Sequence, residues 1–359
     1  MPVRSAMSAV RGRAMRVAEM VATPLLPADY IDLVDPLASS ADLRGRIVSV
    51  LPETQDSATL VIEPGRGWKG HVPGQYVRLG VDVRGVRQWR AYSLTSSPDR
   101  EDGRISITVK AIEDGLVSNH LVHEVPTGTI VHLDQACGEF TLGATRRERA
   151  LFLTAGSGIT PVMGMLRGAA DLLDDVVLIH SAPTGRDVVF GRELRALAEE
   201  GRIELVELHT DEVGMLNPAN LGAMVPDLDR REIWACGPTG MLDSIESHLD
   251  EIGLRHRLHT ERFRPSVVVT GDGGTVTFTE TDATVEADGA TPILDVGEEA
   301  GVLMPSGCRM GICFGCVSPL REGAVRDLRN GEITTATDGE EVLIQTCVSA
   351  AAGNCQIER

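Results

Sequence analysis

Long apolar runs are missing from this chain of 359 residues. The longest uncharged stretch, Leu151 to Leu166, is interrupted by glycines and by Pro161, whereas a membrane-spanning helix needs about 20 apolar residues. No convincing secretory leader is present, and the seven cysteines are an odd number clustered toward one end. The sequence therefore predicts a cytoplasmic protein that keeps its thiols reduced.

Positive charge is also scarce. Lysine and arginine number 34 against 52 acidic residues, for a net charge of −18, which argues against non-specific nucleic-acid binding. The acid excess is concentrated between Ser266 and Arg359, where 15 acidic residues outnumber 5 basic ones. Such a surface can steer a transient basic partner, although an ordinary solvated surface has the same composition.

The standard dinucleotide-binding fingerprint, G-x-G-x-x-G, is absent. Instead, an apolar strand predicted at 150–154 is followed by Gly156-Ser-Gly-Ile-Thr160-Pro and a helix predicted at 162–173. A strand, a glycine turn and a helix open a dinucleotide-binding α/β unit. Further strands are predicted at 176–180, 203–208 and 232–235, with helices at 192–199 and 240–252. This alternation predicts a parallel sheet with helices on both faces and a ligand site at the carboxyl ends of the strands.

Two side chains that follow the strand predicted at 176–180 bear on the choice of nucleotide. Ser181 and Arg186 come where the second ribose of a dinucleotide is expected. A hydroxyl and a guanidinium suit a 2′-phosphate, which favours NADPH over NADH. Many surface loops carry the same residue types, so NADH stays an alternative.

Residues 44 to about 143 contain six short alternating runs, at 46–50, 58–62, 76–81, 87–94, 104–111 and 129–133, which predict a small antiparallel barrel. On the run at 87–94, Arg90 and Tyr92 share one face and Ser93 takes the other. An arginine can bind a pyrophosphate, a tyrosine ring can stack on a flavin, and a hydroxyl can hydrogen-bond the flavin's redox nitrogen. Gly115-Leu-Val-Ser118 opens a helical insertion predicted at 116–122, where a helix N-terminus suits a phosphate.

Four cysteines near the C-terminal end follow the pattern C-x4-C-x2-C…C: Cys308, Cys313, Cys316 and Cys347. This spacing is typical of a plant-type [2Fe–2S] cluster, in which each iron takes two thiolates. Glycines at 307, 311 and 315 permit positive φ and a close approach of N–H groups to the sulfides, and Arg309 could add a donor. Zinc would favour two C-x2-C pairs, and structural disulfides would need an oxidising compartment. A hairpin predicted over 267–286 and a helix at 293–299 place these cysteines in a compact β-rich domain.

Together, these motifs resemble those of the ferredoxin–NADP reductase-like flavoprotein reductases that carry a C-terminal plant-type ferredoxin domain. The resemblance covers about 44–359. It implies a multidomain fold: a helical strap at 1–43, an FAD-binding antiparallel β-barrel at 44–144, an NAD(P)-binding α/β domain with a parallel sheet at 145–264, and a β-grasp [2Fe–2S] domain at 265–359.

The resemblance also implies roles for individual residues. The flavin would be bound by Arg90, Ala91, Tyr92, Ser93 and Thr95 and covered by Phe263. Gly115, Val117 and Ser118 would bind a pyrophosphate, which implies FAD rather than FMN. The nucleotide would be bound by Gly156, Ser157, Gly158, Thr160, Ser181, Arg186, Cys236, Gly237 and Pro238. Tyr92, Ser93 and Cys236 would be the catalytic residues. One departure is Ala136-Cys-Gly138-Glu-Phe140, where the family usually has Pro-x-Gly-x-Phe.

The N-terminal segment carries a narrower resemblance. Thr23 to Leu37 is similar to the leader of actinobacterial reductases that serve membrane-bound acyl-CoA desaturases. The arginine-rich amphipathic helix predicted at 1–22 could rest on an anionic membrane surface or pack on its own protein.

The expected function is therefore an electron-transfer reductase that passes electrons from NADPH through FAD and a [2Fe–2S] cluster to a terminal non-haem iron enzyme. A membrane-bound acyl-CoA or fatty-acid desaturase is the first expectation for that partner. One alternative is an NADH-dependent reductase for a Rieske-type or steroid-hydroxylating oxygenase. Others are an electron-transfer subunit of a larger dehydrogenase and a redox sensor, for which the sequence shows no output module.

Overall fold

The computed structural model describes residues 35–38, 42–113, 115–143, 147–263, 270–307, 309, 311, 314–337, 340 and 342–359. Residues 147 and 148 are described through their backbone alone. The helix predicted at 1–22 lies outside this part of the chain, as do Cys308 and Cys313. Of the helices that are described, none is long and apolar enough to cross a membrane.

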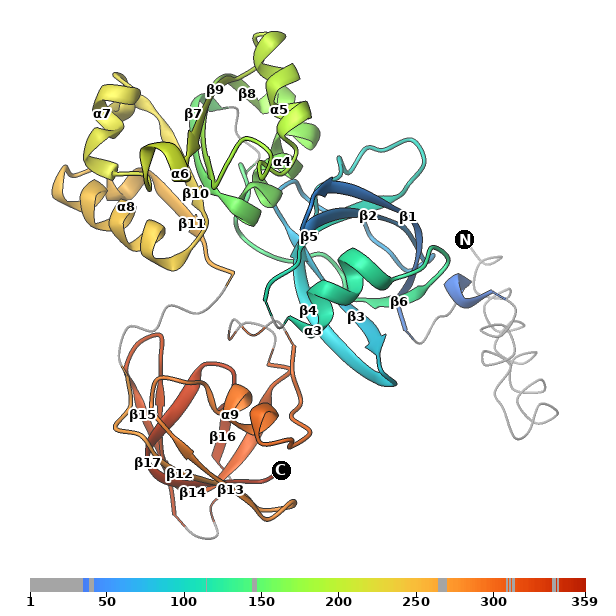
Figure 1. Cartoon of the computed structure of the whole chain (residues 1–359), viewed down its shortest axis with the longest axis vertical. Coiled ribbons are helices and arrows are strands. Elements are labelled where there is room, and N and C mark those ends of the chain that lie inside the picture. Colours follow the sequence, from blue (N-terminus) through green and yellow to red (C-terminus); the bar gives the residue numbers. More distant parts are fainter. Residues whose placement is uncertain are drawn as a thin grey trace, which may run out of the picture.

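The first domain is a six-stranded antiparallel barrel (Figure 1). Its strands are β1 (Arg44–Thr54), β2 (Ser57–Pro64), β3 (Tyr76–Val83), β4 (Val86–Ser93), β5 (Ile105–Lys110) and β6 (Ile130–Leu133), in the order β4-β3-β6-β1-β2-β5. A bridge between Leu94 and Ile107 joins the two outer strands, so the sheet closes as predicted. The insertion after β5 is a helical turn, α3 (Leu116–Asn119), continued by a π-helix, η2 (His120–Glu124). A single 3₁₀ turn, η1 (Pro36–Ala38), precedes β1.

The second domain is a five-stranded parallel sheet in the order β11-β10-β7-β8-β9. Its strands are β7 (Arg147–Ala155), β8 (Leu173–Ala182), β9 (Glu204–His209), β10 (Glu232–Cys236) and β11 (Leu258–Glu261). Helices α4 (Ile159–Gly168) and α5 (Gly191–Glu199) bury their apolar sides on one face, and α7 (Leu221–Met224) and α8 (Thr239–Glu251) on the other. Shorter turns complete it: η3 (Gly156–Gly158), η4 (Ala170–Leu172), α6 (Thr210–Val213), η5 (Pro218–Asn220), η6 (Leu228–Arg230) and η7 (Arg255–Arg257).

Two sequence predictions for this domain are wrong in detail. The helix predicted at 162–173 ends at Gly168, because its tip meets the barrel: a Cβ on Gly168 would lie 2.6 Å from the Cδ of Pro98. No strand was predicted after the helix at 240–252, but Leu258–Glu261 form β11, which pairs parallel with β10. So short a strand gives no period that sequence analysis can detect.

The third domain combines a mixed sheet with one helix, as predicted for a β-grasp fold. Its elements are β12 (Gly274–Phe278), β13 (Ala283–Ala287), α9 (Ile293–Glu299), β14 (Val317–Asp327), β15 (Ile333–Ala336), β16 (Val342–Gln345) and β17 (Ser349–Ile357). Strand order is β13-β12-β17-β14-β15, with β16 paired to β14 and β12 parallel to β17.

The two strands of the hairpin predicted over 267–286 are joined between Phe278 and Ala283, not at the glycines at 273 and 274. The glycines at 273 and 274 have a different use. Gly274 has φ +147°, and a Cβ there would lie 2.5 Å from the carbonyl carbon of Gly353. These glycines therefore mark a close approach of two backbones rather than a turn.

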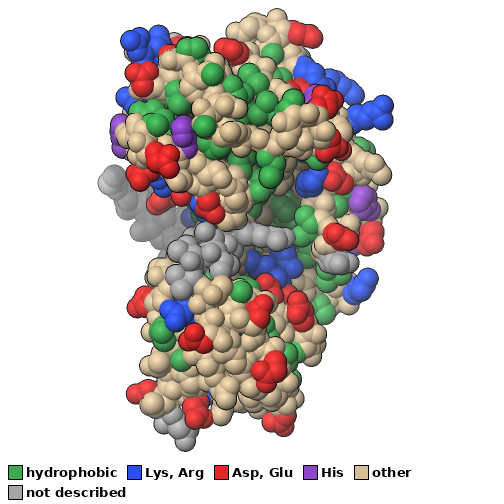
Figure 2. Space-filling model, turned by 60° about the vertical axis from the view of Figure 1, so that its left-hand side comes forward, with side chains coloured by type: hydrophobic (Ala, Val, Ile, Leu, Met, Phe, Trp, Pro, Cys, Tyr) green, Lys and Arg blue, Asp and Glu red, His purple; other side chains and the backbone are tan. Residues whose placement is uncertain are grey.

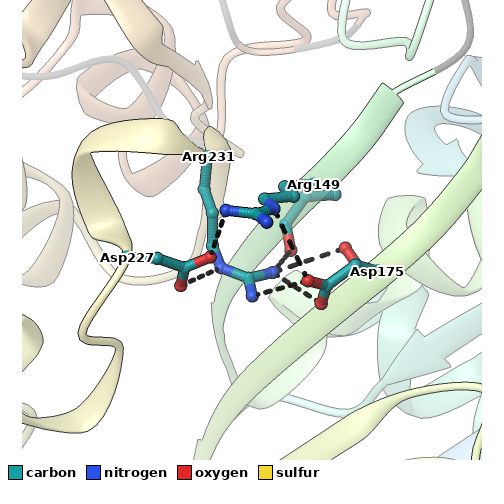
Figure 3. Close-up of polar contacts among 5 residues, drawn as sticks. Arg149, Asp175, Asp227 and Arg231 are labelled. Atoms are coloured by element: carbon teal, nitrogen blue, oxygen red, sulfur yellow. Dashed lines mark hydrogen bonds and ion pairs between the residues drawn. The ribbon is translucent and has the colours of Figure 1, made fainter.

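A charge network ties the amino ends of the parallel strands together (Figure 3). Arg231 is only 5% exposed, and it donates to both carboxylate oxygens of Asp175, each at 3.0 Å, and to Asp227 at 2.8 Å. Another N–H of Arg231 reaches the carbonyl of Ala150 at 3.3 Å, and Arg149 pairs with Asp227 at 3.2 Å. The network lies at the opposite edge of the sheet from the predicted ligand site, so we assign it to stability.

Replacing Arg231 by alanine should lower the free energy of unfolding of this domain by about 2–3 kcal/mol, because Asp175, Asp227 and the Ala150 carbonyl all lose a buried donor and only Arg149 remains to pair with the carboxylates. Native-state hydrogen exchange of the β7, β8 and β10 amides measures the change. Arg202→Ala, which removes an exposed pair with Glu200 at 3.9 Å, is the matched control and should cost less than about 1 kcal/mol. Equal effects of the two substitutions would contradict the assignment.

Candidate functional site

A cleft of about 980 Å³ lies where the three domains meet. Strands β4 and β5 and helix α3 line it from the barrel, Ser157 and Thr160 from the parallel-sheet domain, and α9 and Cys347 from the C-terminal domain. Figure 2 shows positively charged side chains gathered in the hollow between the C-terminal domain and the rest of the molecule. The fold thus brings together motifs that are more than 250 residues apart along the chain, from Arg90 to Cys347.

Arg90 projects a positive charge toward this cleft. Its Nη1 donates to the carbonyl of Trp89 at 2.8 Å, and no described carboxylate is within ion-pairing distance of it. Partial burial lowers the pKa of Arg90, and the nearby Arg309 guanidinium lowers it further. A half-buried cation without a carboxylate partner is the expected state of a residue that binds an anionic ligand.

The residues that follow Arg90 on β4 line the same cleft. Ala91, Tyr92 and Ser93 all contribute to its wall. Burial raises the pKa of Tyr92, so this ring stays neutral at any physiological pH. The hydroxyl oxygen of Ser93 is buried and lacks a hydrogen-bond partner among the described residues. An orphan hydroxyl beside a neutral ring fits a flavin, which offers both an aromatic face and ring nitrogens.

Thr95 is the one predicted flavin residue of this strand that does not line the cleft. Its side chain is fully buried, with its hydroxyl 2.9 Å from that of Ser106 and 3.4 Å from that of Thr108. Its carbonyl accepts a 2.7 Å hydrogen bond from Arg167 of α4. Thr95 thus connects the barrel to the parallel-sheet domain.

The turn at Gly115 forms another part of the cleft wall, together with Val117 and Ser118. A Cβ on Gly115 would lie 2.4 Å from the hydroxyl of Ser118 and 2.5 Å from Ile112, so only glycine fits here. The Ser118 hydroxyl donates to the Gly115 carbonyl at 3.3 Å and accepts from the amide of Ile112 at 3.3 Å. The predicted pyrophosphate motif is therefore a tight turn against the flavin side of the cleft.

The glycine turn after β7 packs against the end of β10. Gly156 has φ +54°, and a Cβ on Gly158 would lie 2.0 Å from the carbonyl oxygen of Cys236. The Thr160 hydroxyl closes the turn by donating to the carbonyl of Ser157 at 2.9 Å. Gly237 and Pro238 continue from Cys236, and Pro238 caps α8. The predicted nucleotide residues Gly156–Thr160 and Cys236–Pro238 therefore meet at one point, at the carboxyl ends of β7 and β10.

A row of polar side chains crosses the sheet at this same edge. The strand register places Glu261, Cys236, Thr154, His180 and Glu207 side by side on adjacent strands. Cys236 is fully buried, and burial together with the Glu261 carboxylate raises the pKa of its thiol. Burial raises the pKa of Glu261 to about 8, and its Oε2 has no hydrogen-bond partner among the described residues. Sequence analysis did not identify Glu261 as a site residue, although it stands two positions before Phe263.

His180 is the second member of this row that sequence analysis did not assign. Its Nδ1 lies 2.8 Å from the hydroxyl of Thr154, and burial lowers its pKa to about 4. The imidazole is therefore neutral at physiological pH. Its Nε2 is buried and lacks a described hydrogen-bond partner.

Ser181 and Arg186 follow at the end of β8. The Ser181 hydroxyl is buried without a described partner, whereas Arg186 is exposed and forms no ion pair among the described residues. Neighbouring charges are already paired: Arg195 donates to both carboxylate oxygens of Glu207, at 2.8 and 2.9 Å. One free hydroxyl and one free guanidinium are thus left at the predicted 2′-phosphate position.

Two of the four predicted cluster ligands are described. Cys316 and Cys347 are both buried, and Cys347 lines the cleft. The amide and the hydroxyl of Thr346 both donate to the Cys316 carbonyl, at 3.3 and 2.9 Å, which holds the two ligand segments together. The carbonyl of Gly311, whose φ is +72°, accepts from Arg329 and Gln345. Two buried thiols on neighbouring, hydrogen-bonded segments fit a [2Fe–2S] site.

Comparison with protein families agrees with this geometry. Residues 56–142 match the oxidoreductase FAD-binding domain, residues 152–247 the oxidoreductase NAD-binding domain, and residues 276–352 the 2Fe-2S iron-sulfur cluster binding domain. The cofactors are therefore FAD, NAD(P)H and a [2Fe–2S] cluster, as predicted.

Similar proteins share the whole three-domain arrangement. The chain is 47% identical over 350 residues to an NADPH oxidoreductase of Mycobacterium tuberculosis, covering 96% of this chain and 91% of that protein. It is 32% identical over 340 residues to the ferredoxin reductase component of 3-ketosteroid-9-alpha-monooxygenase from Mycolicibacterium smegmatis, covering 87% and 95%. The structure of phthalate dioxygenase reductase has the same fold, with a TM-score of 0.59 and 21% identity over 90% of this chain and 99% of that one.

These matches extend over most of the chain. The matched FAD-binding, NAD-binding and 2Fe-2S domains are the three domains that line the cleft. The chain therefore belongs to the ferredoxin-reductase-type oxidoreductases, which combine FAD-, NAD(P)- and [2Fe–2S]-binding domains.

Proposed function

We propose that this reductase takes electrons from NADPH and delivers them singly, through its cluster, to a terminal non-haem iron oxygenase or desaturase. The observation that carries the proposal is the shared cleft, which is lined by Arg90 and Ser93 of the flavin motif, Ser157 of the nucleotide motif and Cys347 of the cluster motif. A flavin supplies the step between a two-electron donor and a one-electron acceptor. The protein's part is to hold the three sites against one another.

The barrel residues position the flavin within the cleft. Arg90 offers an unpaired guanidinium for its phosphate groups, and Ser93 offers a hydroxyl that has no other described partner. Phe263, 36% exposed, lines the cleft where an aromatic ring can cover a flavin face. Removing that cover is the motion by which a nicotinamide could reach the flavin.

The nicotinamide end of the site combines a neutral thiol with a titratable carboxyl. Cys236 and Glu261 lie side by side at the carboxyl edge of the sheet, beside the glycine turn. The nicotinamide ring is positively charged when oxidised and neutral when reduced. An ionised Glu261 would stabilise the oxidised ring, and a protonated Glu261 can donate a hydrogen bond instead.

The choice of NADPH over NADH is supported by Ser181 and Arg186, which carry no competing described partners. The relative from Mycobacterium tuberculosis, 47% identical, is named an NADPH oxidoreductase. A 2′-phosphate would satisfy both the buried hydroxyl and the exposed guanidinium.

The terminal partner has two candidates. A desaturase is favoured by the resemblance of Thr23–Leu37 to the leader of desaturase reductases, most of which lies outside the described residues, as does the proposed membrane contact. An oxygenase is favoured by relatives named as reductases of a 3-ketosteroid monooxygenase and, in Pseudomonas aeruginosa, of glycine betaine monooxygenase, the latter 30% identical over 87% of this chain. Reconstitution with a purified desaturase and with a purified Rieske-type oxygenase, under NADPH and then NADH, separates them.

Cys347→Ser tests the electron route. We expect the variant to lose the cluster's visible absorption and electron delivery to cytochrome c or a terminal enzyme, while it keeps NADPH-dependent reduction of ferricyanide, which accepts electrons from the flavin. Cys355→Ser is the matched control, since that thiol is equally buried but at no ligand position. Undiminished delivery to the terminal enzyme by Cys347→Ser would refute the route.

Arg186→Ala tests the nucleotide preference. Losing a charge-assisted contact to the 2′-phosphate should raise the KM for NADPH about tenfold or more and leave the KM for NADH unchanged. Arg202→Ala, an exposed arginine after α5, should change neither value. A parallel rise for both nucleotides would show that Arg186 does not contact the 2′-phosphate.

Glu261→Gln tests the carboxyl at the nicotinamide end. Because the pKa of Glu261 is raised to about 8, the folded protein keeps a proton that the unfolded chain releases above its ordinary pKa. Stability should therefore fall between about pH 4.5 and pH 8, and affinity for NADP⁺ should rise through pH 8 as the carboxylate forms. Thermal unfolding and NADP⁺ titration across this range measure both slopes. Glu261→Gln should lose the pH dependence of stability and that of NADP⁺ affinity. If either pH dependence is retained, a group other than Glu261 is responsible for it.

A further inference from the structure

The flavin cleft has a charged wall on the side of the C-terminal domain as well as on the barrel side. Asp295 and Glu298 of α9 and Arg309 of the cysteine loop all line it, opposite Arg90 of β4. The family relationship accounts for Arg90 but assigns no function to these three residues.

The described partners of the Arg309 side chain lie on α9. Its Nη1 donates to Asp295 at 2.8 Å and its Nη2 to both carboxylate oxygens of Glu298. Its backbone has φ +57°, which is uncommon for a residue other than glycine and turns the side chain away from a regular path. Its Nε is buried and has no hydrogen-bond partner among the described residues. Arg309 thus lines the cleft with its charge shared between two carboxylates and with one buried donor unsatisfied.

Six charged side chains of described residues line the cleft: Arg90, Lys110 and Arg309 are positive, and Glu113, Asp295 and Glu298 are negative. Arg90 and Arg309 repel each other, and an anion between the two guanidinium groups relieves that repulsion. Asp295 and Glu298 would repel a pyrophosphate, and Arg309 offsets one of their two negative charges.

We propose that Arg309 is a second residue for the phosphate groups of FAD, so that the cofactor is held between the barrel and the C-terminal domain. FAD binding and docking of the C-terminal domain then strengthen each other by the same factor. The cluster would be held against the cleft firmly only when the flavin that reduces it is present. The competing interpretation is that Arg309 only fastens α9 to the cysteine loop.

The two interpretations differ in FAD affinity and in how FAD affects α9. FAD is titrated into the flavin-free full-length protein, with binding followed by quenching of flavin fluorescence. Arg309→Gln should weaken FAD binding about tenfold, as expected for loss of a hydrogen bond to a charged group, and Arg309→Lys should weaken it less. Arg321→Gln is the matched control, because it breaks an ion pair with Glu358 in the same domain, outside the cleft. It should bind FAD as the unaltered protein does.

Hydrogen exchange reports on docking independently of activity. FAD should slow exchange of the amides of α9 in the unaltered protein and in Arg321→Gln, but not in Arg309→Gln. Iron content and visible absorption of each variant confirm that the cluster is present. FAD affinity in Arg309→Gln within twofold of the unaltered protein, or the same FAD-dependent protection of α9, would overturn the proposal.

A second substitution covers the case in which Arg309→Gln loses its cluster. Glu298→Gln keeps Arg309, removes one negative charge from beside the phosphate position and releases part of the guanidinium. It should tighten FAD binding several-fold, since like charges at this distance oppose each other. Equal or weaker FAD binding by Glu298→Gln would overturn the proposal as well.

Discussion

The unneutralised charge of Arg90 is the interaction on which the site depends. In a folded protein a partly buried guanidinium is normally paired, because removing it from water is costly. Here β4 fixes Arg90 at a cleft without a described carboxylate at ion-pairing distance, and its single hydrogen bond goes to the Trp89 carbonyl next to it. The fold therefore bears the cost of a partly buried charge at the position where we propose that a phosphate binds.

The two edges of the parallel sheet differ in whether their buried polar groups have hydrogen-bond partners. At the amino edge, Arg231 donates to Asp175, Asp227 and a backbone carbonyl. At the carboxyl edge, Ser181, His180 and Glu261 each keep a buried polar atom without a described partner. Ligands bind at the carboxyl edge in sheets of this kind, and the unsatisfied atoms are where such a ligand would be recognised.

Sequence analysis succeeded where chemistry depends on residues that are close in the chain. The barrel strands and the glycine turn at Gly156–Thr160 could be predicted from alternation and spacing, and the structure contains both. The residues of the predicted flavin motif from Arg90 to Ser93 line one cleft. It failed where a side chain's partners come from another element. Thr95 faces the barrel interior because Ser106 and Thr108 lie across from it, which strand alternation alone does not reveal. Likewise, Glu261 becomes part of the site only through the pairing of β11 with β10, a strand too short to predict.

The acidic C-terminal domain should be repelled by an anionic cofactor, and Arg309 reduces that repulsion. Residues 266–359 carry 15 acidic and 5 basic residues, and in the proposed arrangement this domain lies against a cofactor whose pyrophosphate is doubly negative. Like charges at such a contact would drive the domain away. Arg309 pairs with both acids of α9 that line the cleft and offsets one of their two negative charges, and Arg90 offers a second positive charge from the barrel. Under the proposed role of Arg309, the charges that face the cleft are offset locally, while the other acidic residues of the domain remain available to an outside partner.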